Sequence, residues 1–274
     1  MEFFGSYTGG DFLAFYAVML ATCLVAGFWI MAALRPPGRR GEVESAEEAA
    51  FLGGGAERHA LAVLAELHAR GALAPSDKAK LRVVGQPGHT SAAERALLVK
   101  VGDFTLAEAV KSLRGEAKAI KARLVRRGML MREEEALKLR LYATAPYAVL
   151  LALGLYRQQA GAALGEPTWF LIALIALTFI LAAIRFFKFS PRTLGGDRAL
   201  AALAERSNRI RRAPQPAEIG LAVGLFGTAV LVGTPWESVH AMRQAASSGD
   251  GGSSGGSDGD GGGGCGGGCG GCGG

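Results

Sequence analysis

The stretch FLAFYAVMLATCLVAGFWIMAAL, from Phe12 to Leu34, decides the fold because it carries no charged residue over 23 positions. A helix of this length is about 34 Å long, enough to cross a hydrocarbon core of about 30 Å. Residues 1–11 are acidic rather than basic, and RPPGRR follows the stretch directly. A cleavable signal peptide has a basic start, a shorter apolar core and a small-residue cleavage site. The stretch therefore predicts a membrane anchor.

Two further apolar runs follow, LYATAPYAVLLALGLY at residues 141–156 and WFLIALIALTFILAAI at residues 169–184. Both are apolar on every face and carry aromatic residues near their ends, which favours two more transmembrane helices over a buried hairpin in a soluble core. A fourth run at residues 219–233, IGLAVGLFGTAVLVG, has only 15 residues. That length is more typical of a buried or interfacial helix, so we predict three spans and leave this crossing open.

Basic residues predict how these spans are oriented. Residues 1–11 contain no Lys or Arg, residues 35–140 contain 20, and residues 157–168 contain one. The segment 185–218 is basic again, with eight Lys or Arg between positions 185 and 212. Positively charged loops remain in the cytoplasm. We therefore expect a multi-pass protein of the cell membrane with residues 1–11 outside and residues 35–140 in the cytoplasm.

Residues 41–140 are predicted to form a helical cytoplasmic domain. Capping boxes begin three helices, with Ser45 before Glu48, Ser91 before Glu94, and Thr105 before Glu108. The glycines of FLGGG should end the first helix, and residues 56–70 should form the second, with Leu61, Leu64, Leu67 and His68 on one stripe. The 3–4 spacing continues from Leu106 to Leu124, where Gly115 could split the helix.

A pattern recurs in this domain, because LHARGALAPSDKAKLRVVG and LVRRGMLMREEEALKLR each end a basic helix in Arg-Gly before an apolar run. In the first copy the PSD turn predicts a small β-hairpin. Helices followed by a hairpin are typical of winged-helix-like domains. One hypothesis is nucleic-acid binding through helix 56–70, since residues 35–140 hold 20 basic against 14 acidic residues. The alternative is a protein-interaction module beside an anionic membrane.

The chain ends in a tail of different composition. Residues 247–274 contain only Ser, Gly, Asp and Cys, which predicts disorder. Its thiols, Cys265, Cys269 and Cys272, are candidate ligands for a soft metal such as zinc or copper(I). Their C-x₃-C-x₂-C spacing is also that of some four-iron clusters, but glycine spacers at a chain end supply no shielding. The alternative is a solvated tether whose thiols are modified, oxidised or recognised by a partner.

Several motifs together resemble a known kind of protein. EEAAFLGGG, HARGAL, RTLGGDRAL, VGLFGTAVL and the terminal GGGGCGGGCGGCGG occur in this order. The chain thus resembles an uncharacterised bacterial membrane-protein family with a conserved domain of unknown function and a Gly/Cys-rich C-terminus. The resemblance touches most of the chain, although only the tail is highly distinctive. It implies no activity, cofactor or catalytic residue.

No pattern in the sequence indicates an enzyme. HExxH, GxSxG, P-loop and dinucleotide motifs are missing, and His59 and His68 fall on opposite faces of one helix. The body holds a single cysteine, Cys23, which excludes a disulfide-stapled secreted domain. We expect a mainly α-helical membrane protein that acts as a membrane-tethered scaffold or protein-interaction protein. Its expected partners are the lipid bilayer and other proteins, with nucleic acid and tail-bound metal as the alternatives.

Overall fold

The computed structural model describes residues 9–39, 41–77, 80–88, 90–163 and 169–248. It is mainly α-helical, as predicted. Contacts divide the chain into two units, each built from two stretches that are distant in the sequence. The three-helix unit comprises Met1–Pro36 and Arg132–Phe189, and the domain unit comprises Pro37–Met131 and Ser190–Gly274.

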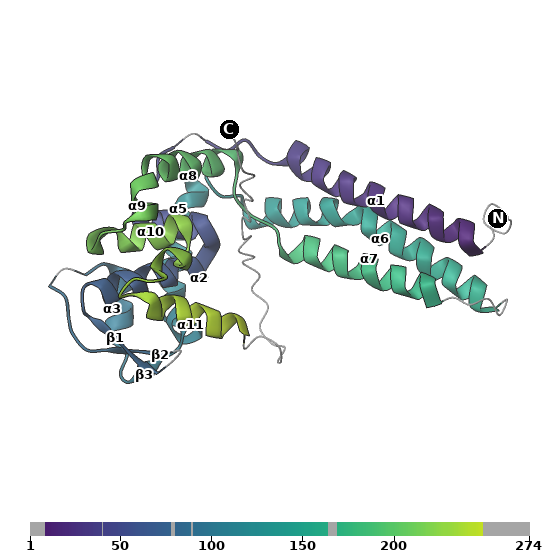
Figure 1. Cartoon of the computed structure of the whole chain (residues 1–274). Helices are drawn as coiled ribbons and strands as arrows, with labels where there is room; N and C mark the ends of the chain where they lie inside the picture. The colour runs from purple at the N-terminus through teal and green to yellow at the C-terminus, as the bar shows by residue number, and fades with distance from the viewer. Residues whose placement is uncertain (1–8, 40, 78–79, 89, 164–168, 249–274) are drawn as a thin grey trace, which may run out of the picture. The chain divides into compact units, whose positions relative to one another are not determined.

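The three-helix unit contains α1 (Gly9–Leu34), α6 (Glu133–Ala163) and α7 (Trp169–Phe187) (Figure 1). Each is long and apolar enough to cross a membrane, which confirms three apolar helices. Their bounds differ from those predicted, because α6 begins at Glu133 rather than Leu141 and continues through Pro146. The polar residues before the apolar run are good helix formers, so nothing ends the helix between the two parts.

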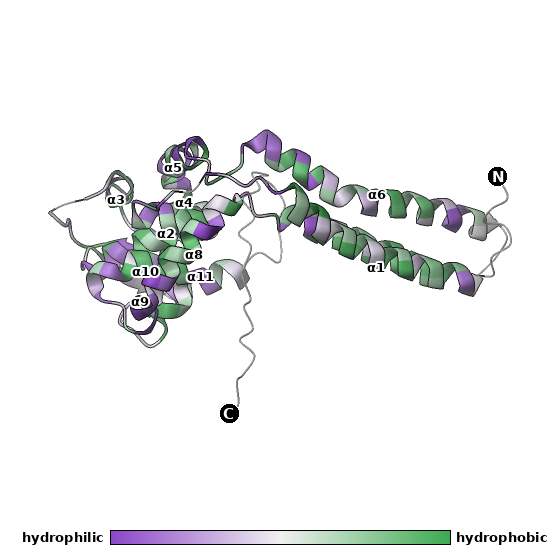
Figure 2. Ribbon diagram, turned by 90° about the horizontal axis from the view of Figure 1, so that it is seen from above, coloured by the Kyte–Doolittle hydropathy of each residue, from purple (hydrophilic) through white to green (hydrophobic). Residues whose placement is uncertain are grey.

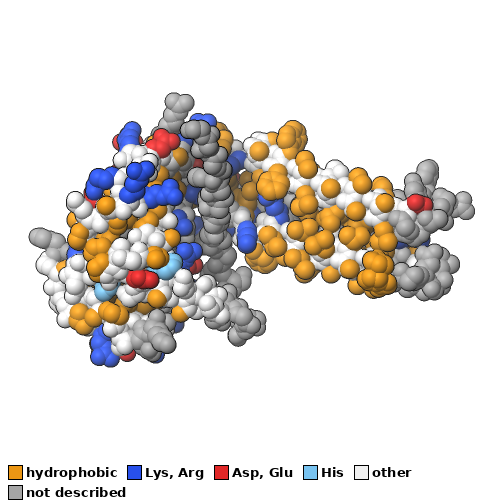
Figure 3. All heavy atoms as spheres, in the orientation of Figure 1, with side chains coloured by type: hydrophobic (Ala, Val, Ile, Leu, Met, Phe, Trp, Pro, Cys, Tyr) orange, Lys and Arg blue, Asp and Glu red, His pale blue; other side chains and the backbone are white. Residues whose placement is uncertain are grey.

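A stripe on α1 packs the three helices together. Phe12, Tyr16, Leu20 and Cys23, spaced three or four residues apart, form a buried cluster with Tyr147 and Leu150 of α6 and Leu171 of α7. The hydroxyls of Tyr16 and Thr178 share a hydrogen bond of 3.2 Å. Hydrophobic residues are frequent along its helices (Figure 2), hydrophobic side chains cover much of the face that Figure 3 shows, and Trp29 is 73% exposed. Such a surface is suited to lipid.

The domain unit holds the remaining elements. Its strands form one antiparallel sheet in the order β1-β2-β3, with Leu73 opposite Val83 and Leu81 opposite Phe104. The predicted hairpin is therefore present, and a short third strand extends it. The elements are α2 (Ala46–Ala69), β1 (Leu73–Asp77), β2 (Lys80–Val83), α3 (Ala92–Leu98), β3 (Asp103–Phe104), α4 (Leu106–Ser112), α5 (Arg114–Arg126), α8 (Leu194–Arg206), α9 (Asn208–Arg212), η1 (Pro216–Glu218), α10 (Ile219–Phe226), η2 (Thr228–Leu231) and α11 (Glu237–Ser248).

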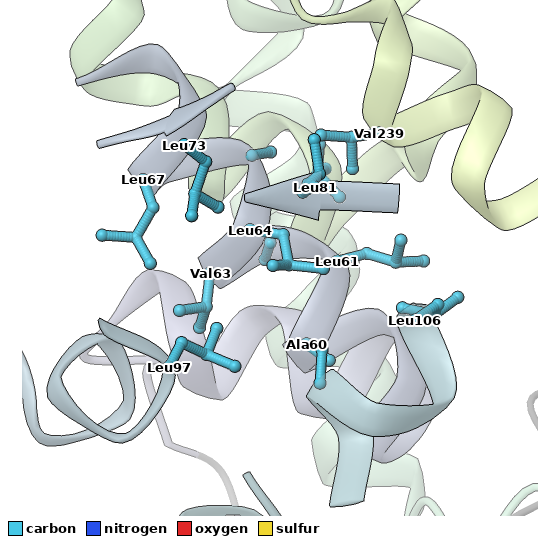
Figure 4. Close-up of a cluster of buried hydrophobic side chains, with 14 of the residues drawn as sticks. Ala60, Leu61, Val63, Leu64, Leu67, Leu73, Leu81, Leu97, Leu106 and Val239 are labelled. Carbon is cyan, nitrogen blue, oxygen red and sulfur yellow. The ribbon is translucent and has the colours of Figure 1, made fainter. Parts of the chain in front are cut away.

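Helix α2 is the centre of this unit. Gly54 and Gly55 have non-helical dihedral angles and divide it into two halves, as the FLGGG motif predicts. The second half is buried on almost every side (Figure 4), from Ala60 to Ala65 and again at Leu67. Its core includes residues from the C-terminal stretch, namely Ile219, Val223, Leu231, Val239 and Met242. Residues 41–140 therefore do not contain their whole hydrophobic core, and residues 133–140 belong to α6 of the other unit.

The apolar run at residues 219–233 forms α10, Gly227 and η2 within the domain unit. Helix α10 crosses the first half of α2 at a point where both helices have glycines, which lets their backbones approach closely. A Cβ at Gly53 would lie 2.4 Å from the Gly224 carbonyl oxygen. Ile219, Ala222 and Val223 are completely buried. This run is thus a core element of the domain, in agreement with leaving it out of the predicted spans.

Local signals that begin and end helices are also present. Ser91–Glu94 and Thr105–Glu108 form reciprocal capping boxes, whereas Ser45 caps α2 but Glu48 accepts the Glu44 N–H instead. The recurring Arg-Gly pattern is a helix C-cap with a left-handed glycine, at Gly71 and again at Gly128. In each copy the residue after the glycine donates back to the carbonyl five residues earlier, as in a Schellman motif.

Three backbone segments of the domain unit meet in one place, which we call the junction: residues 37–39, 128–131 and 191–196. Thr193 N–H donates to the Met129 carbonyl at 3.1 Å, and Gly195 N–H donates to the Pro37 carbonyl at 2.8 Å. The Thr193 hydroxyl, on a side chain that is 3% exposed, reaches the Gly128 carbonyl at 2.8 Å. Backbone packs directly on backbone here, because a Cβ at Gly195 or Gly196 would lie 2.3 Å from a carbonyl oxygen.

The junction predicts that Gly195→Ala and Gly196→Ala each destabilise the domain unit by about 1–3 kcal/mol, because the added methyl meets backbone that cannot move away. Urea unfolding of the purified full chain measures this. Trp236 fluorescence reports on the domain unit after Trp29 and Trp169 are replaced by phenylalanine.

Gly115→Ala is the matched control, because a Cβ at this exposed position of α5 would have no atom within 4 Å. It should leave stability unchanged or raise it by up to about 1 kcal/mol. Junction variants that unfold at the same urea concentration as this control would show that the close backbone approach is unimportant.

Candidate functional site

The predicted metal ligands Cys265, Cys269 and Cys272 lie outside the described residues, as does most of the predicted tail. Its first two residues, Ser247 and Ser248, instead end α11. Within the part of the chain that the structure describes, no group of three His, Cys, Asp or Glu side chains is placed to hold a metal ion. Cys23 is buried in the three-helix unit, among apolar residues.

His59, His68 and His240 occupy separate places in the domain unit. His68 Nδ1–H donates to the Leu73 carbonyl at 2.8 Å, and its Nε2 lies 3.1 Å from the Ser238 hydroxyl. This side chain therefore links α2, β1 and α11. His240 contacts Thr228 at 2.9 Å, which links α11 to η2. Both histidines connect secondary-structure elements within the domain.

A polar cluster surrounds His59 in the domain interior. This side chain is completely buried, its Nε2 lies 3.4 Å from Glu47, and its Nδ1 has no hydrogen-bond partner among the described residues. Glu47 belongs to the first half of α2 and His59 to the second, so the pair spans the glycine break. Arg70 lies between two more carboxylates, bonded to Glu66 and 3.1 Å from Glu94.

Two carboxylates of this cluster have opposite pKa shifts. The hydrogen bond from His59 is the main cause that lowers the pKa of Glu47 below 4.5, against the opposing effect of burial. Burial is the main cause that raises the pKa of Glu66, outweighing the attraction of Arg70. Paired carboxylates with diverging pKa values are typical of acid–base sites. Here they line the contact of α2 with its neighbours, since a Cβ at Gly220 would lie 2.7 Å from Glu66 Oε2.

A second buried carboxylate fastens α2 to α5. Glu48 is 1% exposed and forms ion pairs with Arg123 at 3.1 Å and Arg127 at 3.0 Å. A buried carboxylate loses its hydration, which costs free energy unless cations pair with it. Here the two guanidinium groups offset that cost. Three of the basic residues that suggested nucleic-acid binding, Arg70, Arg123 and Arg127, therefore form ion pairs with carboxylates of the domain, with side chains that are 39%, 49% and 25% exposed.

The hypothesis that helix 56–70 enters a DNA groove does not agree with its surroundings. A recognition helix must expose one face to the bases. The second half of α2 has Ala60, Leu61, Val63 and Leu64 at 3% exposure or less, on all sides of the helix. A helix in this position is available only for packing.

The sequence reasoning missed Arg185, which it placed after the third span. The structure includes it in α7, and its Nη2 donates to the Gly27 carbonyl of α1. Its signal was visible in the sequence, because a single arginine interrupts an otherwise apolar run that resumes with Phe186 and Phe187.

The diverging pKa values predict opposite effects for two matched substitutions. Glu47→Gln should destabilise the domain unit at pH 7 by about 1–2 kcal/mol, because a charged hydrogen bond to a buried side chain is lost. Glu66→Gln should cost nothing or raise stability, since it removes a carboxylate whose ionisation burial disfavours. Urea unfolding followed by Trp236 measures both.

The pH dependence follows from the same shifts. A lowered pKa means that the stabilisation from Glu47 is present above its ordinary pKa of 4.5 and is lost as pH falls through the lowered value. Glu47→Gln should therefore differ from the unsubstituted chain at pH 7 and approach it below pH 4.5. An equal loss for both substitutions at pH 7 would contradict this account of the cluster.

Comparisons with known proteins do not assign the chain to a family. No protein-family model, curated protein or solved structure matches the chain. The resemblance based on the Gly/Cys-rich tail and the RTLGGDRAL motif is therefore an expectation from sequence alone.

Proposed function

We propose that the protein is a multi-pass membrane protein that holds a helical scaffold or protein-interaction domain, with a thiol-bearing tail, at the cytoplasmic face. The junction is the observation that supports this most. Its three segments each lie a few residues from the end of an apolar helix: Leu34 precedes Pro37, Met131 precedes Glu133, and Phe187 precedes Pro191. Linkers of one to three residues span at most about 14 Å.

Because the three segments are hydrogen-bonded to one another, the C-terminal ends of α1 and α7 and the N-terminal end of α6 lie at the same membrane face. This arrangement agrees with the distribution of basic residues, which favours the cytoplasm for the domain and the outside for residues 1–11. The burial of α10 in the domain core supports three spans rather than four. In this topology the tail begins on the same side as the domain.

A domain joined to three membrane helices by linkers of one to three residues is suited to presenting a protein-interaction surface near the bilayer. The tail starts from α11, which is itself docked, because Val239 and Met242 are buried in the core and Ser238 contacts His68. Residues 249–274 follow this docked helix in the sequence, and their composition predicts a flexible segment with a reach of about 30 Å. Cys265, Cys269 and Cys272 are the proposed groups through which the tail captures a partner, with a soft metal as the alternative.

Nucleic-acid binding by residues 41–140 stays the alternative proposal, but it is not favoured through helix 56–70, because that helix is buried and the basic residues of α5 nearest to it pair with Glu48.

Crosslinking in native membranes tests the proposed function. We expect the full chain to form a set of crosslinked partners that is lost when residues 249–274 are deleted. The chain with Cys265, Cys269 and Cys272 replaced by serine is the matched control, because it keeps the length and charge of the tail. It should insert normally and unfold at the same urea concentration while losing thiol-dependent partners.

Identical crosslinked partners with and without residues 249–274 would contradict the proposed role of the tail. Failure of the triple serine variant to insert, or a clear drop in its stability, would show that the tail is structural.

A further inference from the structure

The imidazole of His68 is held between a backbone carbonyl and a hydroxyl. A carbonyl oxygen can only accept a hydrogen bond, so the 2.8 Å contact between Nδ1 and the Leu73 carbonyl requires the ring proton to be on Nδ1. In the neutral ring Nε2 is then an acceptor, and the Ser238 hydroxyl, 3.1 Å away, donates to it. The hydroxyl proton of Ser238 therefore points at a base.

A second hydroxyl–imidazole pair in the domain unit, Thr228 with His240, has the opposite polarity. The amide nitrogen of Gln244, which can only donate, lies 3.0 Å from His240 Nε2. The proton of this neutral ring is therefore on Nδ1, which donates to the Thr228 hydroxyl at 2.9 Å. Thr228 is also completely buried, whereas Ser238 and His68 are both partly exposed. Of these two hydroxyls, only that of Ser238 is accessible and able to give its proton to the imidazole.

The position of Ser238 in α11 adds a donor for negative charge. Ser238 is the second residue of this helix, and N–H groups of a first turn have no acceptor within the helix. The N–H groups of Glu237 and Val239 donate to carbonyls three residues earlier, whereas that of Ser238 has no acceptor among the described residues. Together with the positive end of the helix, it can stabilise an oxyanion that forms beside Oγ.

The hydrophobic core holds these groups in place. Leu67, Leu73 and Val239 are each 2% exposed or less and belong to one buried cluster (Figure 4). Leu67 precedes His68, Leu73 supplies the carbonyl, and Val239 follows Ser238. A hydroxyl and its base carried by such packed elements keep their geometry before any reactant arrives.

We propose that Ser238 is a nucleophile that accepts an acyl group from an activated ester, with His68 as its general base. Oγ attacks the acyl carbon while its proton passes to Nε2 of His68, and the Leu73 carbonyl stabilises the resulting imidazolium through Nδ1–H. The imidazolium then gives this proton to the leaving oxygen, so the products are an acyl-serine and an alcohol.

The orienting group is a neutral carbonyl, whereas a Ser-His-Asp triad has a carboxylate in this place. We therefore expect Ser238 to react with activated esters, such as aryl esters, and not with amides. This reactivity goes beyond the proposed tethering function and does not depend on it.

The test treats the detergent-solubilised full chain with a fluorophosphonate, which forms an Oγ–phosphorus bond with an activated serine and releases fluoride. Peptide mass spectrometry should find the label on Ser238, and p-nitrophenyl acetate should acetylate the same residue. His68→Asn keeps an amide nitrogen for the Leu73 carbonyl but offers no base, so labelling should slow about 100-fold. Ser247 is the matched control, because it is exposed on the same helix and its hydroxyl donates to the Gln244 carbonyl at 2.8 Å. It should stay unlabelled.

Urea unfolding followed by Trp236 shows whether His68→Asn folds. If it does not, Ser238→Cys decides the question in a chain whose four natural cysteines are serine. Its thiol should react with iodoacetamide about tenfold faster at pH 7 than that of Ser247→Cys, because an imidazole and a helix N-terminus favour the thiolate. An unlabelled Ser238, undiminished labelling in folded His68→Asn, equal labelling of Ser247, or equal alkylation of the two cysteines would overturn the site.

Discussion

The hydrogen bonds that Thr193 makes to the backbone of residues 128–129 are the interaction on which the rest of the structure depends. They join the stretch that follows α7 to the stretch that precedes α6, and Gly195 adds the stretch that follows α1. All three connections between the apolar helices and the domain are therefore tied together by backbone contacts. A buried backbone N–H without a hydrogen bond is costly. In this close packing the N–H groups of Thr193 and Gly195 both donate to carbonyl oxygens.

The junction explains why the domain is assembled from two distant stretches of chain. Because residues 191–196 are fixed beside residues 128–131, the segment after residue 196 begins close to the first part of the domain and can pack against α2. There α10 and α11 contribute Val223, Val239 and Met242 to the core. The ion pairs of Glu48 and the cluster around His59 then fasten both halves of α2 to α3 and α5. The charged interior of the domain thus serves mainly to position its helices.

The sequence was informative wherever a signal is local. An uncharged run of 23 residues, a serine three residues before a glutamate, and an Arg-Gly pair each specify their element without distant partners. The glycine break in α2 follows in the same way, whereas the helix expected to split at Gly115 divides at Leu113 instead and Gly115 lies inside α5. The second half of α2 was harder, because a stripe of leucines indicates one buried face, whereas the small alanines at positions 60, 62 and 65 allow close packing on the others.

Features that depend on long-range pairing could not be predicted. Nothing near Gly224 indicates that its carbonyl meets Gly53, and the role of the RTLGGD motif becomes clear only when Gly195 and Gly196 are seen against the backbone of Arg39 and Met129. The inward position of Arg185 likewise depends on a carbonyl in another helix. The tail cysteines remain the strongest candidates from sequence, and they lie outside the described residues.

Cysteine accessibility on intact cells tests the central claim, that one membrane face holds the domain and the three helix ends joined to it. Single cysteines replace Gln159, Ser76, Asn208 or Ala246 in a chain whose four natural cysteines are serine. A membrane-impermeant maleimide should label the Gln159 replacement directly and the other three only after the cells are permeabilised. Labelling of the Ser76 or Asn208 replacement from outside would contradict the account, and labelling of the Ala246 replacement would place α11 and the tail across the membrane from the domain.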